Sequence, residues 1–316
     1  MMTMPRPAST AEELTGNSPL IQDLRRQILR LAQCDVNVVL QGESGTGKEV
    51  VARILHRHSR RREHPFIGVN CAAINDTLLE SELFGHEVGA FTGARHATMG
   101  FLRAADGGTI LLDEIGDMSE SIQSSLLRVI EQRVVSPVGG TREIPIDVRV
   151  VAASHHDLRR AVQEGRFRED LYYRLNVVCL LIPALRERRE DIPLLADHLL
   201  ARIADLLCMP VKSISSQAVQ CLMDYSWPGN IRQLSNAIQR AYVLGQGDTI
   251  QVDDLPRDIL EREHNSCPEL LPLREAIRGH VERALTVTGG KRTEAARILG
   301  IDRKSLWRTM HRHGLT

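Results

Sequence analysis

The chain has 316 residues, 42% of them hydrophobic, which is enough to bury a large core and to form more than one domain. Its 40 basic and 40 acidic side chains give a formal net charge of zero at pH 7, so no overall field selects a nucleic acid or a membrane as partner. The six cysteines lack C-x-x-C spacing, residues 1–10 contain no apolar core of signal-peptide length, and no later run is long enough to span a membrane. These features argue against disulfide-rich secreted proteins and membrane proteins and predict a cytoplasmic protein.

The first predicted element is a short tail, residues 1–14, which carries Pro, Ser and Thr. Residues 15–183 then alternate between apolar strand-like runs and amphipathic helix-like segments. This alternation predicts an α/β domain with a parallel sheet and helical crossovers. The expected strands are 36–40, 66–69, 109–112 and 148–153.

A glycine-rich turn after the first expected strand, followed by an apolar helix-like run, predicts a phosphate-binding loop for ATP. In such a loop the backbone N–H groups and the helix N-terminus face the phosphates, and Lys48 is expected to reach the β- and γ-phosphates. Glu49 stands where a Ser or Thr usually binds Mg²⁺, so the metal must depend on phosphate oxygens, water and a second acidic motif. The loop residues are Gly42, Glu43, Ser44, Gly45, Thr46, Gly47, Lys48 and Glu49.

A hexapeptide further along the chain reads Gly-Ala-Phe-Thr-Gly-Ala. Its side chains offer no acid–base or metal-binding chemistry. Glycine hinges and an exposed aromatic residue suit a loop that moves and grips a partner, and a structural turn is the plain alternative. The hexapeptide residues are Gly89, Ala90, Phe91, Thr92, Gly93 and Ala94.

The apolar run 109–112 ends in two acidic residues, Asp113 and Glu114. Ligands of open α/β sheets bind beyond the carboxyl ends of the strands. Asp113 is expected to bind Mg²⁺ together with phosphate oxygens and water, and Glu114 to orient or deprotonate the attacking water. The combination with the upstream loop predicts an ATPase.

Residues 184–260 change to a helical pattern, with candidate helices at 192–207, 216–225 and 230–244. Residues 261–272 are polar and bounded by proline, which predicts a linker.

The C-terminal segment, residues 273–316, predicts a small helical domain that binds DNA. An apolar stripe marks 273–285, and a glycine-containing turn separates two further helices at about 293–299 and 303–313, which is the helix-turn-helix pattern. Leu306 and Trp307 are expected to face inward.

The last predicted helix has a basic face, which suits phosphate contact and insertion into the major groove. A basic surface helix in a small bundle is the alternative. The expected DNA contacts are Arg303, Lys304, Arg308 and Arg312.

These motifs resemble those of the bacterial sigma-54-dependent transcriptional activators, or enhancer-binding proteins, whose AAA+ domain matches residues from about 14 to about 256. The segment 295–301, Ala-Ala-Arg-Ile-Leu-Gly-Ile, also resembles the Fis-type DNA-binding domain of that family. In this family Glu follows the P-loop lysine, so Glu49 fits it. The matching motifs are 42–49, Asn-Cys-Ala-Ala at 70–73, Glu-Leu-Phe-Gly-His-Glu at 82–87, 89–94, Gly-Gly-Thr-Ile-Leu-Leu-Asp-Glu at 107–114 and Trp-Pro-Gly-Asn-Ile-Arg at 227–232.

The resemblance implies roles that the residues alone do not reveal. Asn70 would hold the catalytic glutamate, and His155 would be the polar sensor of the γ-phosphate. Arg168 and Arg174 match arginine fingers presented to a neighbouring subunit, although a salt-bridged helix is the alternative. Arg232 matches the arginine by which the helical lid detects nucleotide.

The implied protein is an ATP-hydrolysing activator that binds double-stranded enhancer DNA and remodels closed complexes of sigma-54 RNA polymerase into open ones. Residues 89–94 would contact sigma-54. Fingers acting in trans imply a homo-oligomer, from a dimer to a hexamer, and the stripe at 273–285 would be either a dimer surface or core.

Two other functional classes compete with this interpretation. One is a DNA-binding repressor of related architecture, which usually lacks an intact hexapeptide. The other is a general AAA+ remodeller, against which the helix-turn-helix argues. Because only about fourteen residues precede the ATPase domain, we expect no attached input domain and control either by assembly or by a separate regulator in trans.

Overall fold

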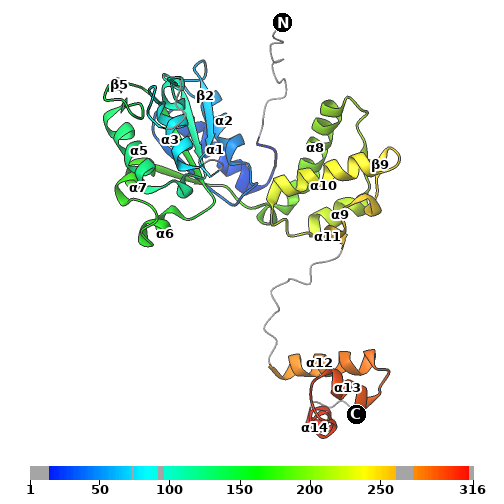
Figure 1. The fold of residues 1–316 in the computed structure, drawn as a ribbon. Coiled ribbons are helices and arrows are strands. Elements are labelled where there is room, and N and C mark those ends of the chain that lie inside the picture. Colours follow the sequence, from blue (N-terminus) through cyan, green and yellow to red (C-terminus); the bar gives the residue numbers. More distant parts are fainter. Residues whose placement is uncertain (1–13, 73–74, 92–95, 261–272, 313–316) are drawn as a thin grey trace. The chain divides into compact units, whose positions relative to one another are not determined.

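The chain forms two compact units, Met1–Leu260 and Glu261–Thr316, each with its own hydrophobic core (Figure 1). The computed structural model describes residues 14–72, 75–91, 96–260 and 273–312. The predicted linker, nearly all of the predicted tail, and three hexapeptide residues, Thr92, Gly93 and Ala94, lie outside the described residues.

A five-stranded parallel sheet in the order β2-β3-β6-β1-β7 forms the centre of the first unit and confirms the predicted fold class. Four of its strands coincide with the predicted runs. The edge strand β7 was not predicted, although it lies in an apolar run, Val177–Ile182. The strands are β1 (Val38–Gln41), β2 (Phe66–Asn70), β3 (Thr109–Asp113), β6 (Arg149–Ser154) and β7 (Val178–Leu181).

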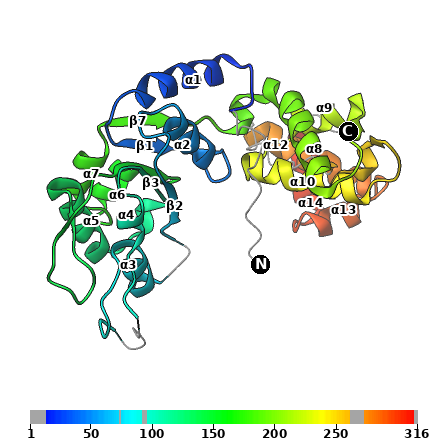
Figure 2. The same cartoon turned by 90° about the horizontal axis from the view of Figure 1, so that it is seen from above.

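Helices pack on both faces of this sheet (Figure 2) because successive side chains of a strand point to opposite faces. Val38 and Leu40 of β1 pack with α1 and α2, whereas Val39 belongs to the cluster on the other face. The helices on the first face are α1 (Pro19–Ala32) and α2 (Lys48–Arg57). The other face carries α3 (Asp76–Phe84), α4 (Phe101–Ala104), α5 (Glu120–Gln132), α6 (Leu158–Gln163) and α7 (Glu169–Leu175).

Residues after β7 build a helical subdomain around the fully buried Trp227, whose indole Nε1 donates a hydrogen bond to the Leu222 carbonyl at 2.7 Å. Two of its helices have the bounds that the sequence pattern predicts, and the third differs by one residue. Its main helices are α8 (Ile192–Leu207), α9 (Ser216–Asp224), α10 (Asn230–Leu244) and α11 (Arg257–Leu260). The short elements of the first unit are η1 (Ile115–Asp117), β4 (Val134–Val135), β5 (Ile144–Pro145), η2 (Leu185–Glu187), η3 (Arg189–Asp191), β8 (Ser213–Ile214), β9 (Thr249–Ile250) and η4 (Val252–Asp254).

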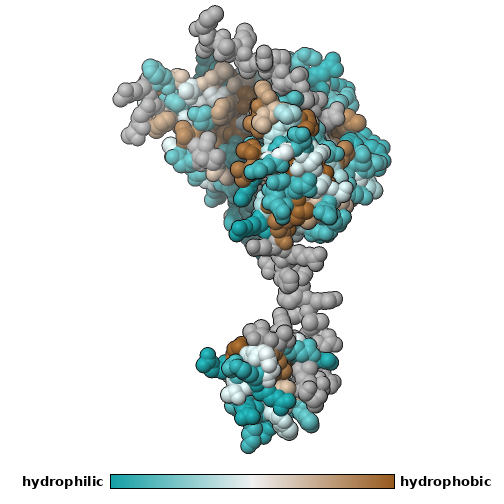
Figure 3. Space-filling model, turned by 90° about the vertical axis from the view of Figure 1, so that its right-hand side faces the viewer, coloured by the Kyte–Doolittle hydropathy of each residue, from teal (hydrophilic) through white to brown (hydrophobic). Residues whose placement is uncertain are grey.

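The second unit consists of α12 (Leu273–Val287), α13 (Arg292–Ile298) and α14 (Arg303–Arg312). Val281 and Ala284, from the predicted apolar stripe, are buried in the small core of this unit, so core packing accounts for at least part of that stripe. Figure 3 shows mainly hydrophilic side chains on the visible face of this unit. Within the described residues, no helix combines the length and the apolar character needed to cross a membrane.

The orientation of α14 corrects one expectation. Leu306 is buried as predicted, but Trp307 is 53% exposed and does not face inward. Leu306 and Met310, one turn apart, are the residues with which α14 enters the core. Trp307, adjacent to Leu306, is rotated about 100° away from that face by the helix geometry.

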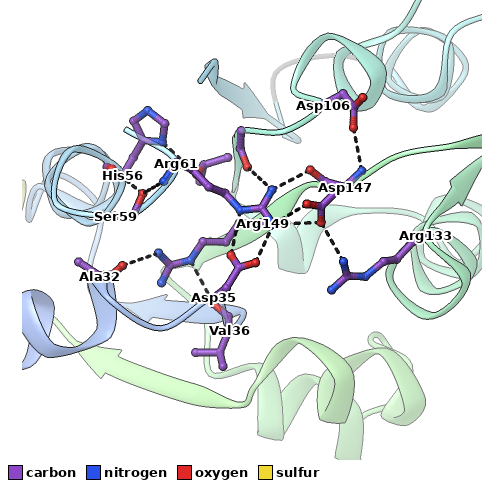
Figure 4. Close-up of polar contacts among 12 residues, drawn as sticks. Ala32, Asp35, Val36, His56, Ser59, Arg61, Asp106, Arg133, Asp147 and Arg149 are labelled. Atoms are coloured by element: carbon purple, nitrogen blue, oxygen red, sulfur yellow. Dashed lines mark hydrogen bonds and ion pairs between the residues drawn. The ribbon is translucent and has the colours of Figure 1, made fainter. Parts of the chain in front are cut away.

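A network of charged groups lies at the amino end of the sheet (Figure 4). Arg149, the first residue of β6, is only 3% exposed and donates to the carbonyls of Leu31 (2.9 Å), Ala32 (3.5 Å) and Val36 (3.2 Å). Two of these carbonyls belong to the last turn of α1: that of Leu31 also accepts the Cys34 backbone N–H at 3.1 Å, whereas Arg149 is the donor described for that of Ala32. Burial lowers the pKa of Arg149, but a guanidinium keeps its charge in proteins.

A second arginine connects three separate segments in the same network. The Arg61 guanidinium forms ion pairs with Asp35 at 2.6 Å and with Asp147 at 3.0 Å, and Arg133 donates to Asp147 at 2.8 Å. The backbone N–H of Asp147 donates a hydrogen bond to the Asp106 carboxylate at 2.8 Å, which holds Asp147 in place. Together with Arg149, these contacts fix the segments that enter and leave the sheet at this end.

We predict that Arg149→Met lowers the free energy of unfolding by about 2 kcal/mol, because it removes the donor to the Ala32 and Val36 carbonyls. Urea unfolding followed by circular dichroism measures this loss. Arg62→Met is the matched control: Arg62 is exposed and pairs only with its neighbour Glu63, so a change within about 0.5 kcal/mol is expected. Equal losses for the two variants would contradict the structural role of Arg149.

Candidate functional site

The predicted phosphate-binding loop forms the turn between β1 and α2, at the carboxyl edge of the sheet. Gly47 is the N-cap residue of α2 with a φ of 100°, and Gly45 has a φ of 78°. A side chain at Gly45 would also place its Cβ 2.4 Å from the Gly229 carbonyl oxygen. Glycine is therefore required at position 45 by both backbone conformation and space.

Lys48 is the first residue of α2 and is only 6% exposed. Its Nζ donates to the Gly42 carbonyl at 3.0 Å and lies 3.4 Å from Oε1 of Glu114. The ammonium group thus lies between the first residue of the loop and the acidic end of β3, and contacts both. Glu49, by contrast, is exposed, and it pairs along its own helix with Arg53.

Asp113 and Glu114 lie where β3 ends, as predicted. Both oxygens of the Glu114 carboxylate have partners: Oε1 contacts Lys48, and Oε2 lies 2.5 Å from Nδ1 of His155 and accepts its backbone N–H at 3.2 Å. Glu114 also has a φ of 55°, in the left-handed region that is unfavourable for a residue with a side chain. The contacts with Lys48 and His155 hold this conformation.

The two carboxyl groups have pKa values shifted in opposite directions. Burial, and secondly the adjacent Glu114, raise the pKa of Asp113. For Glu114 burial acts upward, but the hydrogen bond from His155 and the charge of Lys48 outweigh it and lower the pKa. Glu114 is therefore ionised at neutral pH, and Asp113 lies in a region with an excess of negative charge that a cation would relieve.

Asn70 ends β2 opposite Asp113 in the strand register. Its side-chain oxygen accepts the backbone N–H of Ala72 at 3.0 Å, and the Cys71 N–H donates to the Asp113 carbonyl at 2.9 Å. The structure thus places Asn70 beside the acidic pair, but the hydrogen bonds described for Glu114 come from Lys48 and His155. The predicted hold of Asn70 on Glu114 is not formed in this arrangement.

The amino-terminal turn of α10 contacts the phosphate-binding loop directly. The backbone N–H groups of Ile231 and Arg232 donate to the Gly45 carbonyl at 3.0 and 3.3 Å, and Arg232 Nη1 lies 3.2 Å from the Ser44 hydroxyl. The fully buried Asn230 donates to the Ser44 carbonyl at 3.0 Å and accepts the Leu185 N–H at 2.8 Å. Arg232 therefore lies at the loop, as the resemblance implies.

Two further arginines at this contact were missed by the sequence analysis. Arg186 forms a two-pronged ion pair with Glu43 at 2.6 and 2.8 Å, which is the main cause of the lowered pKa of Glu43. Arg188 is 1% exposed and donates to the Thr46 carbonyl at 3.3 Å. Their signal in the sequence is the dense charge of the segment 186–191, which reads equally well as a solvated surface.

A cavity of about 640 Å³ opens beside the loop. Its walls come from α1, through Leu20 and Leu24, from Gly42 of the loop, and from the end of β7 and the residues after it, through Ile182 and Pro183. Polar residues, among them Gln27 and Gln41, complete the lining, and a cavity of this size with partly apolar walls suits a flat organic group such as a nucleotide base.

The predicted arginine fingers lie on α7 and at its start. Arg168 pairs with Asp170 at 2.7 Å and donates to Ser124 at 3.1 Å, and Arg174 pairs with Glu131 at 2.9 Å. Within one subunit both are therefore members of surface ion pairs. Their side chains remain 36% and 61% exposed, so they are accessible to a neighbour.

The described part of the hexapeptide begins with Gly89, whose φ is 86°. The ring of Phe91 is partly buried and packs edge-on against His86, with ring centroids 5.0 Å apart, so the expectation of an exposed aromatic residue is wrong for this arrangement. The His86 imidazole is itself held by Ser81 and Thr98, each at 2.7 Å. The base of the loop is thus anchored while its tip lies outside the described residues.

The four predicted DNA contacts, Arg303, Lys304, Arg308 and Arg312, all lie exposed on α14. Asp302 begins this helix and accepts hydrogen bonds from the backbone N–H groups of Lys304 and Ser305 at 2.8 and 2.9 Å. The turn before α14 is therefore well defined, and it presents the basic face away from Leu306 and Met310.

Comparison with known protein families matches three successive segments of this chain. Residues 14–181 match the family model described as the sigma-54 interaction domain, residues 186–270 the AAA+ ATPase lid domain, and residues 273–313 the Fis family of bacterial regulatory proteins. The chain is 50% identical over 306 residues to the transcriptional regulatory protein ZraR of Salmonella typhimurium, covering 95% of this chain and 69% of that protein.

Two further similarities extend the comparison. The regulatory protein AtoC of Escherichia coli is 44% identical over 312 residues, covering 95% of this chain and 67% of AtoC. Among solved structures, NtrX from Brucella abortus in complex with ATP superposes with a TM-score of 0.74 at 36% identity, covering 96% of this chain and 70% of NtrX.

Proposed function

Because this chain belongs to the sigma-54-dependent transcriptional activators and is an AAA+ ATPase, we propose that it uses ATP hydrolysis to remodel sigma-54 RNA polymerase at promoters. The observation that carries the proposal is the convergence of Lys48, Asp113, Glu114 and His155 at one edge of the sheet, in the part of the chain that also contains the hexapeptide sequence.

Nucleotide binding follows from the loop and the cavity beside it. The β- and γ-phosphates would lie on the backbone N–H groups at the start of α2 and on Lys48, and the base would enter the cavity between α1 and the end of β7. Asp113 would hold Mg²⁺, with phosphate oxygens and water completing its ligands. The ion would neutralise charge on the phosphates, and the raised pKa of Asp113 reflects a site that a cation would stabilise.

Glu114 would act as the base toward the attacking water. The partners of its two carboxylate oxygens suggest how it is kept inactive before ATP binds. Lys48 and His155, which occupy its two oxygens, are the same groups that are expected to bind phosphate. ATP would compete for both and free the carboxylate, whereas ADP lacks the γ-phosphate that would draw His155 away. Asn70, next to Asp113 in the sheet, is positioned to take up the freed carboxylate.

The lid would detect the nucleotide through Arg232 and the turn around Asn230. Because Ile231 and Arg232 donate to the Gly45 carbonyl, a rearrangement of the phosphate-binding loop must move α10 or break these hydrogen bonds. Arg186, paired with Glu43, adds a second contact between the same two segments.

Arg168 and Arg174 would complete the active site of a neighbouring subunit, in a ring that we propose to be a hexamer. Their present partners are surface acids, and such pairs contribute little stability, so exchanging them for a phosphate costs little. An arginine at the transferring phosphoryl group stabilises its charge and accelerates hydrolysis by about 10³- to 10⁵-fold where this has been dissected.

The remaining roles divide between the two units. The hexapeptide, residues 89–94, would contact sigma-54 and transmit the movement of the site, and the second unit, residues 273–316, would bind enhancer DNA through α14. Residues 15–183 and 184–260 would then be the ATPase subdomain and its lid, with 261–272 as the linker.

Nucleotide assays should distinguish the residue that binds phosphate from the residue that acts on the attacking water. We predict that Lys48→Ala weakens ATP binding about 10- to 100-fold because it removes a charge-assisted contact with phosphate. Glu114→Gln should bind ATP at least as tightly as the unaltered protein but lower turnover by about 10²- to 10⁴-fold. Calorimetry and phosphate release measure the two effects, with the exposed Glu63→Gln as control. Undiminished turnover by Glu114→Gln would remove Glu114 from its role.

Mixing of variants tests the arginine fingers. Arg174→Ala subunits keep their own phosphate site, and Glu114→Gln subunits keep their fingers, so each should be nearly inactive alone. In an equimolar mixture we predict recovery of up to about a quarter of the original turnover, since half of the intact sites gain an intact neighbour. Arg168→Ala should behave like Arg174→Ala, and Arg160→Ala should remain active alone. A mixture that is no more active than its components would contradict action in trans.

Transcription in vitro tests the proposed function itself. We predict that Thr92→Ala and Phe91→Ala keep ATP turnover within about twofold, because these side chains have no chemistry for hydrolysis, yet abolish open-complex formation at a sigma-54 promoter. Permanganate footprinting of the promoter detects the open complex. Val211→Ala, an exposed apolar position on the lid, is the control and should remain active. Normal activation by Thr92→Ala would exclude the hexapeptide as the coupling element.

A further inference from the structure

The face of α14 that points away from the core carries one aromatic residue among its basic ones. Leu306 and Met310 are buried, and Ser305 and Thr309 are partly buried. The exposed residues are Arg303, Lys304, Trp307, Arg308, His311 and Arg312. With a spacing of four residues between Arg303, Trp307 and His311, these side chains form one stripe along the helix.

Trp307 exposes a large apolar surface to water and is not a member of the buried cluster of this unit. The other tryptophan of the chain, Trp227, is fully buried in the lid, whereas Trp307 is 53% exposed. Its ring stacks on the imidazole of His311, with centroids 5.1 Å apart and planes inclined by 13°. This stacking limits the positions of the indole, so it is held in an outward orientation.

We infer that Trp307 reads thymine in the major groove, by packing its ring against the C5-methyl group of the base. This inference rests on the proposed binding of α14 to DNA. The indole carries no charge and has only one N–H donor, so it is a poor ligand for phosphate, which the surrounding arginines and lysine bind well. The thymine methyl is the apolar group that base edges present in the major groove.

The position of Trp307 on the helix supports this assignment. It lies one turn after Arg303 and one turn before His311, in the middle of the exposed stripe and not at its margin. The N-terminal turn before it is fixed by Asp302, and Leu306 beside it is anchored in the core. A base-reading residue needs such a rigid support, because discrimination depends on placing the ring to within a fraction of an ångström.

The test uses the full chain and a binding site selected with it from genomic DNA. Each thymine of that site is replaced in turn by deoxyuridine, which lacks only the methyl group, and affinity is measured by anisotropy of labelled DNA at fixed salt. We expect at least one replacement to weaken binding by the unaltered protein about fourfold, the contribution of one buried methyl group. The same replacement should have no effect on Trp307→Ala, and an intermediate effect on Trp307→Phe.

Arg312→Ala provides the matched control. It should keep the full methyl effect while lowering the slope of log affinity against log salt by about one, as expected for a lost phosphate contact. Trp307→Ala should leave that slope unchanged. Because Trp307 is half exposed, its replacement should also leave the circular dichroism spectrum and the melting temperature unchanged.

Two outcomes would overturn the inference. If every deoxyuridine replacement affects Trp307→Ala and the unaltered protein alike, Trp307 does not read a methyl group. If Trp307→Ala binds the selected site and random DNA with the same loss, the residue contributes only to non-specific binding or to contact with another protein. Failure of the unaltered chain to select any site would instead contradict the proposed DNA-binding function.

Discussion

The hydrogen bonds between the Gly45 carbonyl and the first turn of α10 are the contact on which the proposed coupling between nucleotide and lid depends. They join the phosphate-binding loop, which is a turn of the sheet, to the helical lid, which has its own core around Trp227. Gly45 can have no side chain there, because its Cβ would meet the Gly229 carbonyl. A loop held this closely by two subdomains can change its shape for a ligand only by moving α10 or by breaking these hydrogen bonds.

In the proposed active site, the Glu114 carboxylate and a bound phosphate would compete for the same two partners. Glu114 lies in an unfavourable backbone conformation and shares its two oxygens between Lys48 and His155. Lys48 and His155 can each bind a phosphate as well as a carboxylate. A bound phosphate would therefore weaken both contacts with Glu114 at once. Burial and the adjacent Glu114 raise the pKa of Asp113, and it is the closeness of the two carboxyl groups that would attract a cation. In the proposed mechanism, nucleotide binding and release of the base would therefore be consequences of one set of contacts.

The second unit shows how a small core leaves a surface free for recognition. The α14 helix contributes Leu306 and Met310 to the buried cluster, and the opposite half of its circumference is exposed. That half carries basic side chains and Trp307, although the chain as a whole has no net charge. Local concentration of charge, and not the overall balance, decides which surface meets a polyanion.

Strands β1, β2, β3 and β6, the lid helices α8, α9 and α10 and the phosphate-binding loop could be predicted from the residues alone, because hydrophobic period, glycine position and strand ends are local properties of the chain. The fold was needed to show that Lys48 and His155, in place of Asn70, are the partners described for Glu114, and that Phe91 is partly buried against His86. It also showed β7 at the sheet edge and Trp307 facing outward. These features depend on distances between segments far apart in the chain and on which side of a helix meets the core, and neither is encoded in a short stretch of residues.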